Sequence, residues 1–146
     1  MTQGIKHLAF ATYVTGTLEA KAHRVFTNAM TRTLKQHNVS VPQWSVLGVL
    51  YEHEEQRPFQ IADALSVRPP VATALINELE AKKFILRRVH ATDNRATIIV
   101  LTRQGRQLVT KVERHMQKDL RELLGDITVP ELSVYIRVLA KLAAKG

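Results

Sequence analysis

The sequence predicts a mainly α-helical fold with one small β-hairpin, and two observations lead to this class. Along most of the chain, apolar residues recur at spacings of three and four, which places them on one face of a helix. The period changes only between residues 85 and 101, where a polar tip is followed by a run of β-branched side chains, as in a hairpin. The few Gly and Pro residues fall at punctuation points and do not gather into a Gly- or Pro-rich stretch, so no linker is expected.

The length and composition suit a single cooperative domain. The chain has 146 residues, of which 45% are apolar and 23% are charged. No apolar run approaches the roughly 18 to 20 residues that span a bilayer, and the start lacks a signal peptide, so we expect a cytoplasmic protein without a membrane partner. The absence of cysteine excludes disulfides, thiolate metal ligands and regulation by thiol oxidation.

The first predicted helix covers residues 5–37 and carries a long stripe of mostly small residues. The stripe consists of Leu8, Ala11, Thr15, Leu18, Ala22, Val25 and Ala29. At about 1.5 Å per residue, an unbroken helix of this length reaches roughly 50 Å, which a monomer of this size cannot cover. We therefore expect a partner chain to cover the stripe, and Gly16 marks a place where the helix breaks or bends.

A capping-box pattern opens the second helix. The Ser40 side chain is suited to accept a hydrogen bond from the free amides of the first turn, and Gln43 is suited to reach back three residues later. This helix is expected to end near His53. Residues 57–59 then favour a short extended piece.

A short helix and a longer one come next. Residues 60–65 predict a helix of under two turns, and residues 66–68 form a turn after it. A pair of prolines suits the first turn of the longer helix, which runs to about Lys82. Its apolar face is expected in the core and consists of Val71, Leu75 and Leu79.

A hairpin and two further helices complete the chain. Residues 85–89 and 96–101 predict the two strands, with a polar, basic tip between them. Thr102 is the expected N-cap of a long helix, and Thr128 repeats the capping pattern at the start of the last one. The apolar row of the long helix consists of Leu108, Val112, Met116, Leu120, Leu123 and Ile127.

Positive charge is concentrated in the middle of the chain. The formal net charge is +8, and residues 56–106 hold nine basic and four acidic residues. This is the electrostatic footprint that phosphate binding requires. Charge alone leaves RNA and anionic membranes open as partners.

The order of short helix, three-residue turn, longer helix and basic hairpin is that of a winged helix-turn-helix. A DNA major groove about 12 Å wide admits one helix, the preceding helix braces it, and a hairpin tip reaches the flanking minor groove. The longer helix must then keep one face apolar for its brace and the other free for bases. The free face, with the turn before it, offers Arg68, Pro70, Thr73, Ala74 and Asn77.

Four pieces of this region form a recognisable pattern. They are residues 61–65, residues 71–80, an Arg followed by Asp-x-Arg (Arg88, Asp93 and Arg95), and Leu-Thr-x-x-Gly at residues 101–105. In these pieces the chain resembles the MarR family of winged helix-turn-helix transcriptional regulators. The resemblance covers roughly residues 40–107 by motif and the whole chain by architecture.

The resemblance implies a division of the chain into two parts. Residues 1–37 and 107–146 would form a helical dimerisation region in which two chains interlock, and residues 38–106 would form the DNA-binding domain. Arg95 would enter the minor groove, with Asp93 holding its guanidinium in place. A fixed planar cation suits a narrow, electronegative groove.

Two positions depart from the family pattern. Lys83 stands where the family has Gly after the recognition helix, so a left-handed cap there is strained or the helix ends differently. Ala74 stands where a basic or polar side chain projects toward the bases. It is able to touch a thymine methyl but not to donate a hydrogen bond, so specificity is expected to rest on Arg68, Thr73, Asn77, the wings and DNA shape.

The residues predicted to contact DNA come from the helix-turn-helix and the wing. They are Gln60, Arg68, Pro70, Thr73, Ala74, Asn77, Arg88, His90, Asp93, Asn94 and Arg95. Without the hairpin and the resemblance, Asp93 and Arg95 would read as a solvated surface pair worth under about 1 kcal/mol. Arg87, Arg88 and Arg103 are equally consistent with solvated or phosphate-contacting side chains.

Other kinds of site have weaker support in the sequence. Phe26, Trp44 and Tyr51 are candidates for the wall of an aromatic effector pocket, although Trp44 also suits a core position. The six histidines form no pair at metal-ligand spacing, so neither a metal nor another cofactor is expected. No nucleophile, phosphate loop or close carboxylate pair is present, so an enzyme is not expected.

Two hypotheses of different class follow. The first is a homodimeric, sequence-specific regulator, a repressor, that binds a pseudo-palindromic double-stranded operator and is released by a small aromatic or other ligand. The alternative is a winged-helix protein interaction module in which DNA binding is lost or incidental. The few hydrogen-bond donors on the recognition face favour the alternative.

Overall fold

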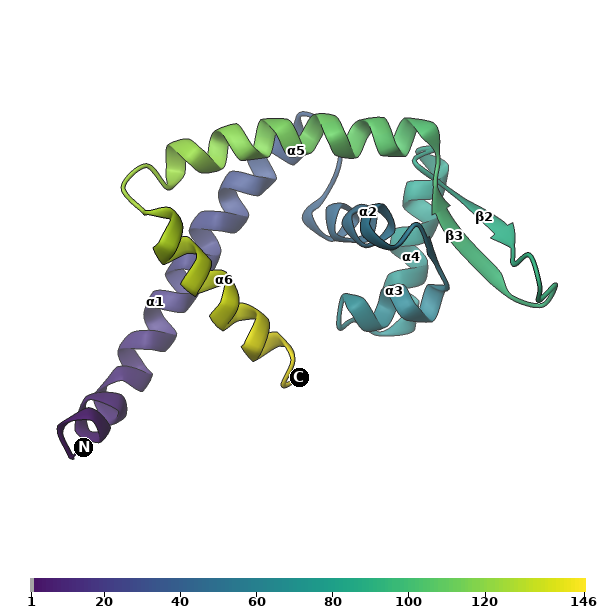
Figure 1. Cartoon of the computed structure of the whole chain (residues 1–146). Coiled ribbons are helices and arrows are strands. Elements are labelled where there is room, and N and C mark those ends of the chain that lie inside the picture. Colours follow the sequence, from purple (N-terminus) through teal and green to yellow (C-terminus); the bar gives the residue numbers. More distant parts are fainter. Residues whose placement is uncertain (1) are drawn as a thin grey trace.

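The computed structural model describes the backbone of residues 2–146 and the side chains of residues 15–146. The chain forms a small winged-helix unit from which long helices extend (Figure 1). In chain order, the elements are α1 (Thr2–Lys35), α2 (Val41–His53), β1 (Glu55–Gln56), α3 (Pro58–Ala64), α4 (Pro69–Ala81), β2 (Ile85–Val89), β3 (Thr97–Leu101), α5 (Arg103–Leu123) and α6 (Val129–Ala143). The mainly helical fold with a small hairpin is confirmed.

The three strands form one antiparallel sheet in the order β1-β3-β2. Strands β2 and β3 make the hairpin, with Ile85 opposite Leu101 and Val89 opposite Thr97. The two-residue strand β1 adds to the other edge of β3, where Glu55 pairs with Val100. In Figure 1 the hairpin projects away from the helices as a wing.

The helix starts follow the local capping chemistry. The Ser40 Oγ accepts from the Gln43 amide at 3.2 Å, and the Gln43 side chain accepts from the Ser40 amide at 3.2 Å. Thr128 and Glu131 form the same reciprocal pair at α6, and those hydrogen bonds lower the pKa of the Glu131 carboxyl. The predicted caps are therefore confirmed.

The core lies where α2, α3, α4, the sheet and the first half of α5 meet. It contains fully buried Leu and Ile side chains from α2, α3, α4 and the sheet, such as Leu47, Ile61, Leu79 and Ile99, and α5 adds the fully buried Val112. Among its described side chains, helix α1 reaches this core near its C-terminal end, through Leu34 and the partly buried Met30. Among the described residues, no helix is both long and apolar enough to cross a membrane.

Two polar contacts join α1 and the turn that follows it to α5. The buried Thr33 hydroxyl donates to the Asp119 carboxylate, and the imidazole nitrogens Nε2 of His37 and Nδ1 of His115 lie 3.1 Å apart. Burial, the neighbouring His115 and Lys111 all lower the pKa of His37. These contacts fix the angle at which α1 leaves the winged-helix unit.

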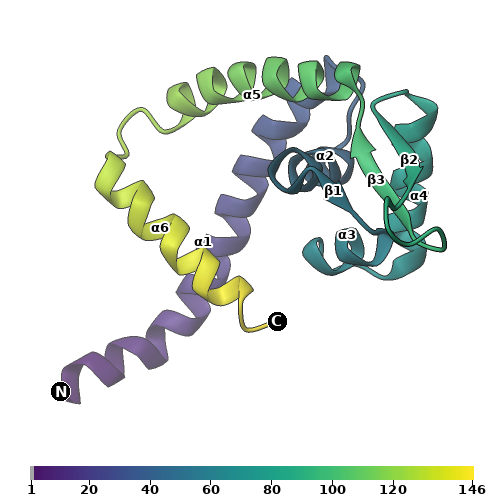
Figure 2. The same cartoon turned by 45° about the vertical axis from the view of Figure 1, so that its right-hand side comes forward.

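Most of α6 lies outside any core of the single chain. None of its side chains is buried, although it carries Tyr135, Ile136, Leu139 and Leu142. Figures 1 and 2 show it crossing α1, and the rings of Phe26 and Tyr135 stack there with centroids 6.1 Å apart. Leu18 and Val25 of α1 are also exposed. Leu8 and Ala11 of the predicted stripe lie outside the described side chains.

Three element predictions are wrong in detail. The extended piece is Glu55–Gln56 rather than residues 57–59, because Pro58 and Phe59 start α3, where proline is favoured. Of the two expectations for Gly16, the break is wrong, because helix α1 continues through this residue. Helix α5 ends at Leu123, so Ile127 lies beyond it, and its buried row includes Val109 in place of Leu108.

Helices α1, α3 and α4 end in left-handed residues that are not glycine. Asn38, Ser66 and Lys83 have φ of 55°, 52° and 64°. At α4, the Lys83 amide donates to the Glu80 carbonyl at 2.9 Å and the Phe84 amide to the Leu79 carbonyl at 3.1 Å, the two bonds of a Schellman motif. Lys83 thus adopts the geometry that the family fills with Gly, at a steric cost of about 1–2 kcal/mol.

We predict that Lys83→Gly stabilises the fold by about 1 kcal/mol, because Gly removes the Cβ clash at positive φ and leaves both Schellman bonds in place. Urea unfolding followed by circular dichroism measures the change. Lys83→Ala is the matched control and should give no gain, since it keeps a Cβ. A lower midpoint for Lys83→Gly would show that the lysine side chain itself holds this turn.

Candidate nucleic-acid interface

Helix α4 is fixed to the domain by one apolar face. The side chains of Ala72, Leu75, Ile76 and Leu79 are buried against α2, α3 and the sheet. Val71 was expected in this row but is 41% exposed, because it lies in the first helical turn, before the buried 72–75–76–79 stripe begins. The prolines at 69 and 70 occupy that first turn, where no intrahelical amide is needed.

A polar network fixes the same helix from α2. The buried Gln43 amide donates to the Glu78 carboxylate at 2.6 Å, and the Lys82 ammonium donates to the Gln43 carbonyl oxygen at 2.9 Å. Lys82 also donates to the Asn38 backbone carbonyl at 2.6 Å. Gln43 of the α2 capping box therefore holds the C-terminal half of α4, a second role that no sequence pattern indicated.

The opposite face of α4 is open to solvent. Pro70, Thr73, Ala74 and Asn77 are all exposed, as is Arg68 at the N-cap position. This is the face that the helix-turn-helix pattern assigns to bases. Asn77 is nevertheless engaged, because its side-chain oxygen accepts a hydrogen bond from Arg87 of β2 at 2.6 Å. Arg87 also pairs with Glu80 of α4.

The tip of the wing is a compact turn. The His90 amide donates to the Ala96 carbonyl at 2.8 Å, and the Ala96 amide donates to the Asp93 carbonyl at 2.9 Å. Within the tip, the Thr92 amide donates to Nδ1 of His90 at 3.3 Å. Asn94 and Arg95 are exposed beyond these bonds.

Asp93 does not play the role that the resemblance implied. Its carboxylate accepts from the Arg95 backbone amide at 3.1 Å and lies 3.9 Å from the Arg57 guanidinium. The turn directs the carboxylate back to the peptide group, so Asp93 shapes the loop on which Arg95 sits instead of holding its guanidinium. Arg57 lies at the start of α3, where its own amide donates to the Gln60 side chain at 2.8 Å.

Arg88 lies on the other side of the wing from Arg87, as strand alternation requires. It lines a small hollow with Glu54, Glu55 and Arg106. Arg87 faces α4, whereas the side chain of Arg88 has no hydrogen bond or ion pair with another described residue. The sequence assigned the DNA contact to Arg88 and left Arg87 without a specific role.

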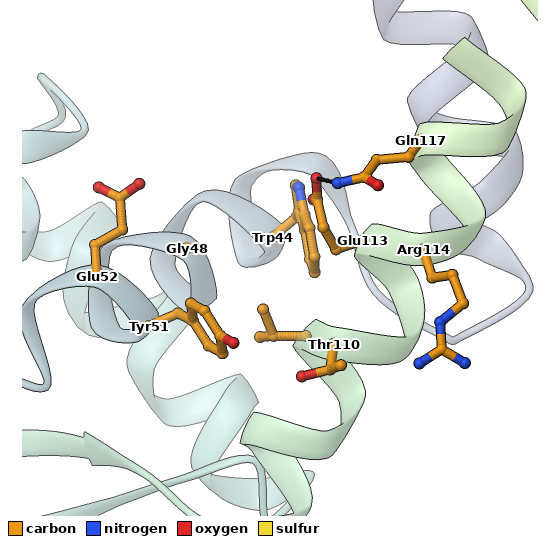
Figure 3. Close-up of a pocket in the computed structure, with 9 residues that line it drawn as sticks. Trp44, Gly48, Tyr51, Glu52, Thr110, Glu113, Arg114 and Gln117 are labelled. Carbon is orange, nitrogen blue, oxygen red and sulfur yellow. Dashed lines mark hydrogen bonds between the residues drawn. The ribbon is translucent and has the colours of Figure 1, made fainter. Parts of the chain in front are cut away.

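A cleft of about 550 Å³ separates α2 from α5. Figure 3 shows the rings of Trp44 and Tyr51 on α2 facing Thr110 of α5 across this space. The Arg114 guanidinium lies apart from both rings, and Glu113 accepts a hydrogen bond from Gln117 at 3.0 Å. The Arg106 guanidinium lies 5.5 Å from the centre of the Tyr51 ring.

Phe26 does not line this cleft. The sequence grouped it with Trp44 and Tyr51, but its ring stacks on Tyr135 of α6. It lies on the part of α1 that faces α6, whereas α1 approaches α2 and α5 only further along. Among the described residues, no cluster of three His, Asp or Glu side chains is placed to hold a metal ion.

The braced helix, the turn before it and the arginine-tipped hairpin define a winged helix-turn-helix protein. Residues 39–97 match the model of the MarR family. The winged-helix domain of this chain is therefore a MarR-family domain. The solved structure of the transcriptional regulator PA4135 has the same fold, with a TM-score of 0.76 at 23% identity, over 88% of this chain and 95% of that one.

Several solved structures share the fold over most of their length. A mutant of MarR from E. coli complexed with operator DNA has a TM-score of 0.77 at 20% identity, over 87% of this chain and 91% of that one. BpsR from Bordetella bronchiseptica, whose DNA binding is regulated by 6-hydroxynicotinic acid, has a TM-score of 0.76 at 20% identity, over 88% and 91%. A mutant of MepR from S. aureus bound to an oligodeoxyribonucleotide has a TM-score of 0.64 at 26% identity, over 89% and 96%.

Proposed function

We propose that the protein is a homodimeric repressor that binds a pseudo-palindromic DNA operator. The observation that carries this proposal is the bond between Arg87 and Asn77, which sets the wing beside the exposed face of α4. The wing must lie beside α4 if the helix is to enter the major groove while the hairpin tip enters the flanking minor groove. The DNA complexes of the MarR and MepR mutants support the same reading.

In this proposal the two parts contribute differently to binding. Arg68, Thr73 and Asn77 meet base edges and phosphates from α4, while Arg95 enters the minor groove from the wing. Ala74 and Pro70 add apolar contact only. Gln60, Arg88, His90 and Asn94 remain candidates for backbone contacts around them.

Dimerisation is proposed from the apolar surface of the long helices. Residues 1–37 and 107–146 form the dimerisation region, and residues 38–106 the DNA-binding domain. Helix α6 buries none of its own side chains, although seven of its large hydrophobic residues are more than a third exposed. Exposed apolar faces of this extent mark contact surfaces in soluble proteins. A second copy related by two-fold symmetry would match the symmetry of the operator.

A small aromatic ligand is proposed for the cleft between α2 and α5. Its size suits a small molecule, and the rings of Trp44 and Tyr51 supply flat apolar walls. Trp44 directly follows Gln43, which holds α4 through Glu78. A ligand in the cleft would thus contact Trp44, the residue next to Gln43, which anchors the recognition helix. The regulation of BpsR by 6-hydroxynicotinic acid supports a ligand of this class.

We predict that Arg95→Ala lowers operator affinity roughly 10- to 100-fold, or about 1.4–2.8 kcal/mol, and reduces the slope of log affinity against log salt by about 1. The measurement is a gel shift with duplex from upstream of the protein's own coding sequence, at several salt concentrations. Arg121→Ala, at an exposed arginine in the last turn of α5, is the control for loss of charge.

Two results would contradict the assignment. An unchanged affinity and footprint for Arg95→Ala would reject the wing contact. Wild-type binding that is equal for an unrelated duplex and disappears with modest salt would instead favour the protein interaction module.

We predict that the double variant Leu139→Glu and Leu142→Glu converts the dimer into a monomer, because it places two charges on the exposed apolar face of α6. Light scattering measures the mass, with the monomer at 16.5 kDa. Ser133→Glu, at an exposed polar position of the same helix, should leave the dimer intact. A monomeric wild-type protein would refute the proposed dimer.

We predict that a small aromatic acid changes the fluorescence of Trp44, which is the single tryptophan of the chain. The probe is 6-hydroxynicotinic acid, followed by benzoate. Tyr51→Ala should weaken binding about tenfold or more through loss of one aromatic wall, whereas Phe26→Ala, outside the cleft, should not. The ligand site would be rejected if Tyr51→Ala and the wild type bound the acid with equal affinity. It would also be rejected if neither acid changed the fluorescence of Trp44 at millimolar concentration.

A further inference from the structure

Arg87 joins the wing to the recognition helix at the face proposed to meet DNA. Its Nη2 atom donates to Oδ1 of Asn77 at 2.6 Å, and its Nη1 atom donates to the carboxylate of Glu80. Asn77 and Glu80 lie one turn apart on α4, so the planar guanidinium bridges two adjacent positions of that helix. The side chains of Arg87 and Glu80 remain 35% and 38% exposed.

The chemistry of arginine decides which way the Asn77 amide faces. A guanidinium carries only donors, so it bonds the oxygen of the carboxamide and not its nitrogen. The Asn77 oxygen is therefore directed toward Arg87 and β2, and its NH₂ group faces the other way. Glu80 holds the guanidinium through a second hydrogen bond, which restrains its rotation and with it the orientation of the amide.

This orientation changes what Asn77 offers to a base. An asparagine reads adenine with two bonds, in which its oxygen accepts from N6 and its nitrogen donates to N7. Here the oxygen side is occupied by the guanidinium, and a base edge meets the Asn77 NH₂ group beside further Arg87 donors. Guanine presents two acceptors, N7 and O6, to the major groove, so it is the base that this row of donors fits.

We propose that Arg87 is a specificity-determining residue that turns Asn77 into a hydrogen-bond donor, so that one position of each half-site is read as guanine in preference to adenine. The inference rests on the proposed function, in which the exposed face of α4 lies in the major groove. Arg87 acts here as a positioning residue for Asn77. Ala74, one turn earlier on the same face, has no donor, which leaves Asn77, with Arg87 beside it, as the hydrogen-bond donor of the second half of the helix.

The test is a selection of bound duplexes from a randomised DNA library with the full-length protein. Asn77→Ala identifies the motif position that Asn77 reads, because preference at that position is lost. The wild type should favour guanine over adenine there by roughly tenfold. Arg87→Ala should reduce this ratio to near one or invert it, because the freed amide can then pair with adenine. Arg87→Met, which keeps the aliphatic stem, should give the same change and guards against misfolding of the alanine variant.

Two matched controls separate specificity from charge and fold. Arg121→Ala removes the same charge at an exposed arginine in the last turn of α5, outside the proposed DNA surface, and should leave the motif unchanged. Glu80→Gln removes the negative charge but leaves Arg87 bonded to Asn77, so the guanine preference should persist.

The outcomes distinguish this inference from the proposed function. A wild-type selection that enriches no motif would refute sequence-specific DNA binding and this inference with it. A clear wild-type motif that Arg87→Ala and Arg87→Met leave unchanged would overturn the inference alone. The inference alone would also be overturned if Asn77→Ala changed the base preference at no position of the motif. A wild-type preference for adenine at the position that Asn77→Ala identifies would overturn it too.

Discussion

The recognition helix, the wing and α5 meet at the backbone of Phe84, and the rest of the structure depends on this junction. The Phe84 carbonyl accepts from the Thr102 amide at 3.0 Å and from the Thr102 hydroxyl at 3.2 Å. A Cβ at Gly105 would overlap the same carbonyl, so only Gly lets the first turn of α5 approach so closely. The Leu-Thr-x-x-Gly motif therefore sets how α5 is placed relative to the DNA-reading elements.

This junction makes α5 a shared support for both ends of the molecule. Its first turns contact the base of the wing, and its middle forms one wall of the cleft opposite Trp44 and Tyr51. Its later turns hold α1 through Asp119 and the turn after α1 through His115. Helix α2 has a similar supporting role, because Gln43 anchors α4 while Trp44 lines the cleft. The proposed dimer surface, ligand cleft and DNA surface are thus built on the same two helices.

The recognition surface is poor in hydrogen-bond donors when α4 is considered alone, and that observation favoured an interaction module. The contact between Arg87 and Asn77 changes this view, because the wing supplies donors beside the helix. Asp93 similarly acts through the loop backbone, and Arg57 of α3 approaches it from the neighbouring element. The donors are shared between elements that are distant in sequence, and the whole domain presents them together.

The sequence by itself determined the order of elements, the helix starts and the family pattern, because these follow from contacts within a few residues. Ser40 with Gln43 and Thr102 with Gly105 are examples, and the left-handed turn at Lys83 was already indicated. Only the tertiary structure decided which partners side chains find across elements: Phe26 with Tyr135, Asp93 with Arg57, Asn77 with Arg87, and the exposure of Val71. The physical reason is that a helical or strand period identifies a face, whereas what lies opposite that face is set by how distant segments pack.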